Sequence, residues 1–334
     1  MTTLYVKGYS TYIGLVSKRL KVMRAGSLVE TVRLRDLERV VLLGNVEVSG
    51  PAMAALLDNG IDVVLLSHSG RFRGRLEPAE GKSVLVRQAQ FRKHDDMEFR
   101  LRVGRAIVEA KIQNSRSVVQ RYLRNHPDCN LGEAVSRLQF CRENVARQTT
   151  LDALLGVEGD AAKVYFQAFG SMVGSEFSFE SRTRRPPRDP VNALLSFGYT
   201  LLTAELAGAV AAEGLDIHVG FLHELAHGRP SLALDMVEEF RQPIVDRLVL
   251  SLINRGVLKR DHFEDRGQAG VLLNDTGRDR FIGFYHHALD AEFGLRVGHD
   301  DAEKTTYREL FRRQARRMRE AVTGGADYEP FTIR

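Results

Sequence analysis

Cysteine is scarce in this sequence of 334 residues, which contains only Cys129 and Cys141. The two cysteines need no disulfide framework and offer no Cys-x-x-Cys metal spacing, so they favour a reducing compartment. No run of about 18 uncharged apolar residues occurs, and we therefore expect no membrane span. The first residues lack a basic segment leading into an apolar one, which argues against a secretory leader. These absences predict a cytoplasmic protein with no membrane partner.

Internal repeats and low-complexity tracts are also absent. The chain is long enough for two domains, or one large domain, with a proper core. Its 43% hydrophobic and 27% charged residues are ordinary for a soluble globular protein. A net charge of +5 only mildly suggests a polyanionic partner, so the distribution of the basic residues is more informative than their total.

The N-terminal part, residues 1–83, has the pattern of a β-rich domain. Short β-branched runs lie at residues 4–6, 31–34, 40–43 and 46–48, and glycines separate them. A helix is predicted over residues 51–58, with Pro51 at its start. A buried strand over 61–66, a turn at 68–70 and a strand over 71–76 follow. This pattern predicts a β-sandwich-like domain or a split sheet.

The remainder, residues 84–334, has a helical pattern. Apolar positions recur every three to four residues, and the spacing is illustrated by Val103, Ile107, Ala110 and Lys111. We expect a larger all-α domain here, which makes the whole chain an α+β protein of two domains. The segment 175–189 is rich in arginine and proline and is expected to be an exposed connection.

The stretch from Gly220 to Arg241 contains the most informative candidate site residues. His223-Glu224-Leu225-Ala226-His227 matches the H-E-x-x-H pattern of zinc metallopeptidases. That pattern works when one continuous helix places both histidines on the same face. Gly228 and Pro230 would end any helix directly after His227. The zinc-peptidase alternative is therefore weak.

Carboxylates follow this break. Ser231 can cap a helix that extends through Glu239, and on that helix Asp235, Glu238 and Arg241 share one face. A solvated, charge-patterned face is the ordinary alternative, although the apolar neighbours indicate a buried element. Glu158 can likewise be a helix N-terminal glutamate favoured by the helix dipole.

Several ordered motifs resemble one family, the CRISPR adaptation integrase, which inserts new spacers into CRISPR arrays. They are L-L-G-x-E-G (154–159), R-R-P-P-x-D-P-x-N-A-L-L-S-x-G-Y (184–199), G-F-L-H (220–223) and S-L-A-L-D-x-x-E-E-F-R (231–241). Motifs that occur together in this order are far more specific than any one of them alone.

The resemblance implies a metal-dependent DNA endonuclease and integrase. Glu158, His223 and Glu238 match the family's metal ligands, and they would act as the catalytic residues with Mg²⁺ or Mn²⁺. Asp235 would orient a ligand or a water molecule. The 3′-hydroxyl of captured DNA would attack the end of a repeat by transesterification.

The resemblance also implies partners, namely double-stranded and branched DNA. The candidate phosphate contacts are Arg182, Arg184, Arg185, Arg188 and Arg241. Family members form homodimers through the N-terminal domain, and a small ferredoxin-like CRISPR adaptation subunit completes a hetero-hexamer. A catalytically inactive DNA-binding subunit that has the same residues but holds no metal is the remaining alternative.

Overall fold

The computed structural model describes residues 2–67, 72–76, 84–295 and 303–333. The chain forms two compact units, Met1–Ser83 and Val84–Arg334. The predicted turn at residues 68–70 and the start of the strand predicted at residue 71 lie outside the described residues.

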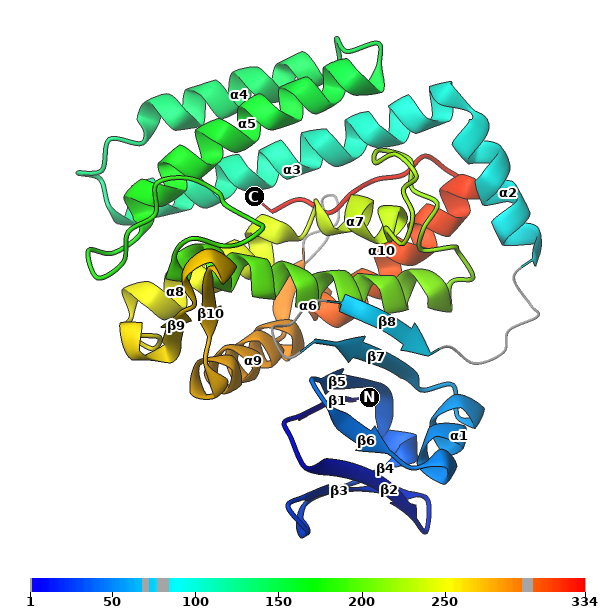
Figure 1. Ribbon diagram of the computed structural model, residues 1–334. Coiled ribbons are helices and arrows are strands. Elements are labelled where there is room, and N and C mark those ends of the chain that lie inside the picture. The colour runs from blue at the N-terminus through cyan, green and yellow to red at the C-terminus, as the bar shows by residue number, and fades with distance from the viewer. Residues whose placement is uncertain (1, 68–71, 77–83, 296–302, 334) are drawn as a thin grey trace. The chain divides into compact units, whose positions relative to one another are not determined.

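The N-terminal unit contains two four-stranded sheets (Figure 1). The first sheet has the order β1-β5-β7-β8, in which the first three strands are parallel and β8 is antiparallel. Its strands are β1 (Thr2–Lys7), β5 (Leu37–Leu43), β7 (Asp62–Leu66) and β8 (Phe72–Leu76). The second sheet has the order β4-β3-β2-β6 and consists of β4 (Ser27–Arg33), β3 (Arg19–Arg24), β2 (Thr11–Val16) and β6 (Val46–Val48).

Both sheets contribute to one hydrophobic core. Alternate residues of β1 and β5 bury Leu4, Val6, Val40 and Leu42, and the second sheet adds Ile13, Leu20 and Val22. Helix α1 (Gly50–Asp58) closes the core with Leu56. The strand-rich N-terminal region and the helix over residues 51–58 thus agree with the sequence prediction.

The β2–β3 hairpin was not predicted. Ser17 and Lys18 connect the two strands, and both have positive φ angles, 50° and 60°. Hairpin turns of this kind normally contain Asn-Gly or Asp-Gly. Because neither pair is present, the sequence gives no turn signal at this position.

The second unit is mainly helical, and α3, α4 and α5 pack against one another (Figure 1). Its helices are α2 (Val84–Asp95), α3 (Met97–Asn125), α4 (Gly132–Val145), α5 (Leu151–Met172), α6 (Pro190–Ala212), α7 (Ser231–Val237), α8 (Arg247–Asn254), α9 (Asp275–Asp290) and α10 (Tyr307–Val322). A π-helical turn, Arg241–Asp246, precedes α8.

The expectation of an all-α domain was wrong in one respect. Two antiparallel ribbons occur, β9 (Phe263–Asp265) with β10 (Val271–Leu273), and β11 (Phe293–Leu295) with β12 (Glu303–Thr305). Each strand has only three residues, which is too short for alternation to distinguish it from a loop.

Helix α6 has the length and composition of a membrane span, but it contains Glu205, and 78% of its apolar window is buried inside the protein. It packs against α7 and α10. Its Glu205 is buried and paired with Arg308, Oε2 to Nη1 2.9 Å. These contacts identify α6 as the core helix of the unit.

Candidate active site

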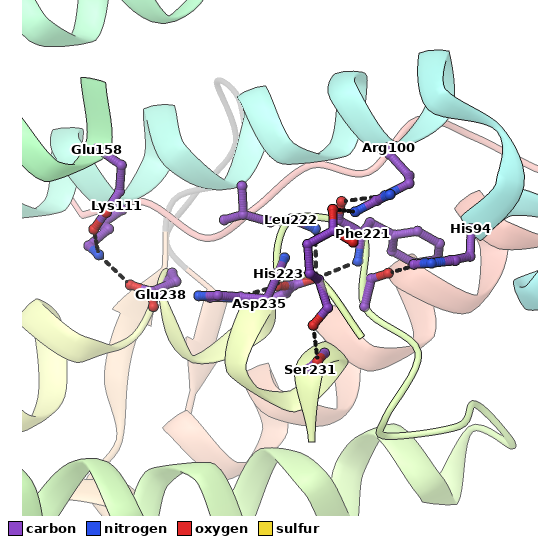
Figure 2. Close-up of polar contacts among 12 residues, drawn as sticks. His94, Arg100, Lys111, Glu158, Phe221, Leu222, His223, Ser231, Asp235 and Glu238 are labelled. Carbon is purple, nitrogen blue, oxygen red and sulfur yellow. Dashed lines mark hydrogen bonds and ion pairs between the residues drawn. The ribbon is translucent and has the colours of Figure 1, made fainter. Parts of the chain in front are cut away.

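Two of the predicted site residues meet at Lys111, for which the sequence predicted only a position on a helix face. Glu158 lies on α5, and Glu238 lies directly after α7. The Nζ atom of Lys111 on α3 contacts Glu158 Oε1 and lies 2.6 Å from Glu238 Oε2. Figure 2 shows Lys111 between the two glutamates. A lysine at an otherwise apolar position of a helix was the available signal.

Glu238 is almost completely buried, with 4% of its side chain exposed, and it also pairs with Arg241, 2.9 Å from Oε1 to Nη2. Burial opposes ionisation of this carboxyl group. The positive charges of Arg241 and Lys111 outweigh that effect and lower the pKa of Glu238 to about 2. Glu238 is therefore an anion at neutral pH.

Asp235 holds the segment that contains His223. Its carboxylate accepts hydrogen bonds from the backbone N–H groups of Phe221, Leu222 and His223, at 2.6, 3.0 and 3.0 Å. The ring Nδ1 of His223 lies 2.6 Å from Asp235 Oδ1. Because a carboxylate only accepts, Nδ1 donates and the Nε2 lone pair is left for another ligand. Asp235 thus fixes the orientation of the His223 ring.

The approach of Asp235 requires glycine at position 220. A Cβ atom at Gly220 would lie 2.7 Å from Asp235 Oδ2 and 2.8 Å from the carbonyl carbon of Ser231. Both distances are shorter than Cβ contacts in proteins. The G-F-L-H motif therefore begins with glycine for a steric reason.

Helices α2 and α3 brace the same segment (Figure 2). His94 Nδ1 lies 2.7 Å from Gly220 O, and Arg100 Nε donates to Phe221 O at 3.2 Å. Arg100 also pairs with Glu224 at 2.7 Å. The loop is therefore held on two sides, by these helices and by Asp235.

The zinc-peptidase alternative fails on backbone geometry. Residues 221–230 contain no helix, so His223 and His227 do not share a helical face. Glu224, the general base of that motif, is paired with Arg100 instead. Gly228 has a φ angle of +67°, which is incompatible with a continuing α-helix, as predicted.

The predicted helix after Pro230 is shorter than expected, and its cap differs. It ends at Val237, and Pro230 precedes it with no side-chain cap. The Ser231 hydroxyl donates to Glu224 O at 3.0 Å instead of capping. Asp235 contacts His223, and Glu238 contacts Lys111 and Arg241.

The donor types suit a divalent ion. Glu158 and Glu238 reach one common cation, and His223 is near enough to Glu238 to interact with it electrostatically. Two carboxylates and an imidazole are the ligands that Mg²⁺ and Mn²⁺ accept. Across the described part of the chain, no three His, Cys, Asp or Glu side chains stand together as a metal site, and Lys111 lies between the glutamates.

The arginine cluster divides into packed and exposed members. Arg182 donates to Asn192 Oδ1 at 2.7 Å and lies over the Tyr199 ring, 5.4 Å from its centroid. Arg241 lies 4.7 Å from the same centroid. Arg184, Arg185 and Arg188 are exposed. The segment is therefore only partly the exposed connection that was expected.

Asn192 holds this loop. Its amide nitrogen donates to Ser181 O at 2.8 Å, and its oxygen accepts from Thr183 N at 2.9 Å.

A buried carboxyl group, Asp246, adjoins the site and was not predicted. It accepts from the Tyr199 hydroxyl at 2.6 Å and the Tyr165 hydroxyl at 2.9 Å. Burial raises its pKa to about 6 against the effect of these hydrogen bonds. No sequence motif marks such a residue, because its role depends on two helices that are distant in the chain.

Known proteins share both sequence and structure with this chain. A family model described as "CRISPR associated protein Cas1" matches residues 4–287. The CRISPR-associated endonuclease Cas1 1 of Chlorobaculum tepidum is 34% identical and covers 100% of this chain and 99% of its own length. A casposase bound to integration product is 25% identical with a TM-score of 0.87, covering 99% of this chain and 93% of that one.

A further solved structure, a Cas6-RT-Cas1–Cas2 complex, is 25% identical with a TM-score of 0.84 and covers 100% of this chain and 36% of that one. The match of the family model over most of the chain, together with the full-length relative, agrees with the ordered motifs. The chain belongs to the Cas1 family of CRISPR-associated proteins.

Proposed function

We propose that this protein is a metal-dependent DNA endonuclease and integrase of CRISPR spacer acquisition. The observation that carries the proposal is the convergence of Glu158 and Glu238 on one cation beside an Asp235-held His223. The relative named as an endonuclease and the casposase bound to integration product support the same class of reaction.

Glu158, His223 and Glu238 would hold Mg²⁺ or Mn²⁺, which supplies charge stabilisation to a scissile phosphate and a leaving 3′-oxygen. Asp235 keeps the His223 ring in the tautomer that leaves Nε2 free. Gly220 allows the backbone to approach Asp235 closely enough for this arrangement.

The substrate in this proposal is double-stranded or branched DNA. The 3′-hydroxyl of a captured fragment attacks a phosphodiester bond of the repeat, and the displaced 3′-oxygen leaves with the former strand. One phosphodiester bond forms as another breaks, so no covalent enzyme intermediate is required. The exposed Arg184, Arg185 and Arg188 would neutralise backbone phosphates, each contributing to a salt-dependent affinity.

We further propose that the protein works as a homodimer joined through the N-terminal unit. A small ferredoxin-like adaptation subunit would complete a hetero-hexamer. The solved complex whose printed name includes both Cas1 and Cas2 supports a Cas2-type partner.

Strand transfer tests the proposal. A fluorescent duplex with free 3′-hydroxyls is incubated with a repeat-bearing target in Mn²⁺, in EDTA, and with the Glu158→Ala variant. We expect joining only in Mn²⁺ and its loss in the variant. Joining that survives Glu158→Ala would contradict the site assignment. DNA binding without joining, in the presence of the Cas2-type partner, would instead favour the inactive DNA-binding subunit.

A further inference from the structure

The ammonium group of Lys111 occupies the space between the two carboxylates of the candidate site. Its side chain is only 10% exposed, and its Nζ atom contacts one oxygen of each glutamate (Figure 2). Glu238 has a second cation in Arg241, whereas for Glu158 Lys111 is the one ion-pair partner among the described residues. The lysine therefore provides the charge that keeps Glu158 and Glu238 together.

A divalent ion that bridged these glutamates would need the same region of space. Two like carboxylates held close together require a cation between them, because their mutual repulsion is large in a partly buried site. One cation must leave when the other binds, since an ammonium group and a metal ion cannot both occupy that position.

We infer that Lys111 is a positioning residue that competes with the divalent ion for Glu158 and Glu238 and thereby sets the metal affinity of the protein. This inference rests on the proposed function, in which the same two glutamates are metal ligands.

A second position for the displaced ammonium group is available nearby. Lys111 and Gln242 both line a cavity of about 10 Å³, which is roughly the space of one water-sized group. Gln242 is 2% exposed, and its Oε1 atom has no hydrogen-bond partner among the described residues. An unpaired buried acceptor beside a lysine is costly unless a donor reaches it in some state of the protein. The Lys111 ammonium group is that donor when the ion is bound.

The experiment measures Mn²⁺ binding directly, by the electron paramagnetic resonance signal of free Mn²⁺, without DNA. Wild type is compared with Lys111→Met, Lys111→Arg, Glu158→Ala and the exposed control Lys163→Met on α5. Lys111→Met should bind Mn²⁺ at least about tenfold more tightly than wild type, because the competing charge is gone. Lys111→Arg, which keeps the charge, and Lys163→Met should remain within about threefold of wild type.

The outcomes separate the inference from the proposed function. One outcome is that wild type binds Mn²⁺, Glu158→Ala does not, and folded Lys111→Met binds no more tightly than wild type. That outcome overturns the inference and leaves the proposed function intact. The inference is also overturned if Lys111→Arg binds Mn²⁺ more tightly than wild type, as Lys111→Met does. Loss of the positive charge would then not be the cause of the tighter binding. If neither wild type nor Lys111→Met binds Mn²⁺, the metal site is wrong and both fail.

Gln242→Leu provides a second test that keeps Lys111. We expect this variant to bind Mn²⁺ about three- to tenfold more weakly than wild type, because the displaced ammonium group loses its acceptor. In the Lys111→Met background the same substitution should have no effect. An equal weakening in both backgrounds would mean that Gln242 acts independently of Lys111 and would contradict the proposed displacement.

Discussion

At the residue scale, Asp235 combines two functions in one carboxylate. It accepts hydrogen bonds from three backbone N–H groups and fixes the ring of His223, and its side chain is fully buried. A buried acceptor that satisfies several donors is expensive to replace, since each donor left unpaired costs about 1–3 kcal/mol. We therefore expect both the stability of the protein and the affinity of the proposed metal site to depend on this carboxylate.

Replacement of Asp235 by asparagine should lower both the free energy of unfolding and the affinity for Mn²⁺. The amide directs an N–H group at backbone donors, so we expect the free energy of unfolding to fall by about 2–4 kcal/mol. Mn²⁺ affinity should fall about 10–100-fold, as for other residues that orient metal ligands. Urea unfolding and Mn²⁺ titration measure the two effects. Asp160→Asn at an exposed position of α5 is the matched control and should change neither.

Asp246 makes stability depend on pH. Its folded-state pKa of about 6 lies above the unfolded value of 3.8, so the folded state prefers the protonated group. Its stabilising contribution is fully present below about pH 4 and is lost as pH rises through 6, a change of about 3 kcal/mol. In urea unfolding between pH 4 and pH 7.5, the stability of Asp246→Asn relative to wild type should rise with pH. A pH-independent difference between the two proteins would contradict this assignment.

Some residues of the candidate site could be predicted from the sequence, and others could not. Glu158, His223 and Glu238 were predicted because they lie in ordered motifs, and Asp235 was predicted from its position near Glu238. Lys111 was not, because periodicity treats every third or fourth position of a helix alike. Its partners come from α5 and from the end of α7, and nothing local in α3 encodes that meeting.

At the scale of elements, the loop before α7 is shaped by contacts on both sides of a glycine. Gly220→Ala would force its new methyl group against Asp235 and Ser231. We expect a loss of about 1–3 kcal/mol in the free energy of unfolding and at least a tenfold loss of strand transfer. Gly283→Ala in α9, where no atom lies within 4 Å of the added Cβ, should stabilise the protein by up to about 1 kcal/mol.

Helix α3 also holds the segment at residues 331–333. Asn114 donates to Glu239 O at 2.8 Å and to Phe331 O at 3.0 Å, and it accepts from Ile333 N at 2.8 Å. Asn114→Ala removes all three hydrogen bonds. We expect the free energy of unfolding to fall by about 2–4 kcal/mol, and amide exchange at Ile333 to be faster in hydrogen-exchange mass spectrometry. Unchanged exchange there would mean that other contacts hold this segment.

The elements were predicted unevenly for physical reasons. The helix with proline at its start was recognisable at Pro51. The hairpin turn at Ser17-Lys18 was missed because ordinary side chains adopt positive φ there. Ser231 was a plausible cap by residue type, but its hydroxyl group found a tertiary acceptor in Glu224. Local signals fail where a distant contact decides the local structure.

At the scale of the whole molecule, the chain consists of two units that each have a core. Leu56 of α1 is fully buried in the N-terminal core. Leu56→Ala should destabilise that unit by about 2–5 kcal/mol through the cavity it leaves. Hydrogen exchange should accelerate in peptides from residues 2–67 and stay unchanged in those from 84–295. Equal acceleration in both units would show that they unfold as one.

The balance of charge around Lys111 has a consequence for the order of events. Glu158 and Glu238 contribute two negative charges, and Lys111 and Arg241 contribute two positive charges, so the four groups sum to zero. These four groups therefore exert no net repulsion on an approaching polyanion, even when a chelator has removed every divalent ion. In the proposed function, we therefore expect DNA to bind both with and without the ion.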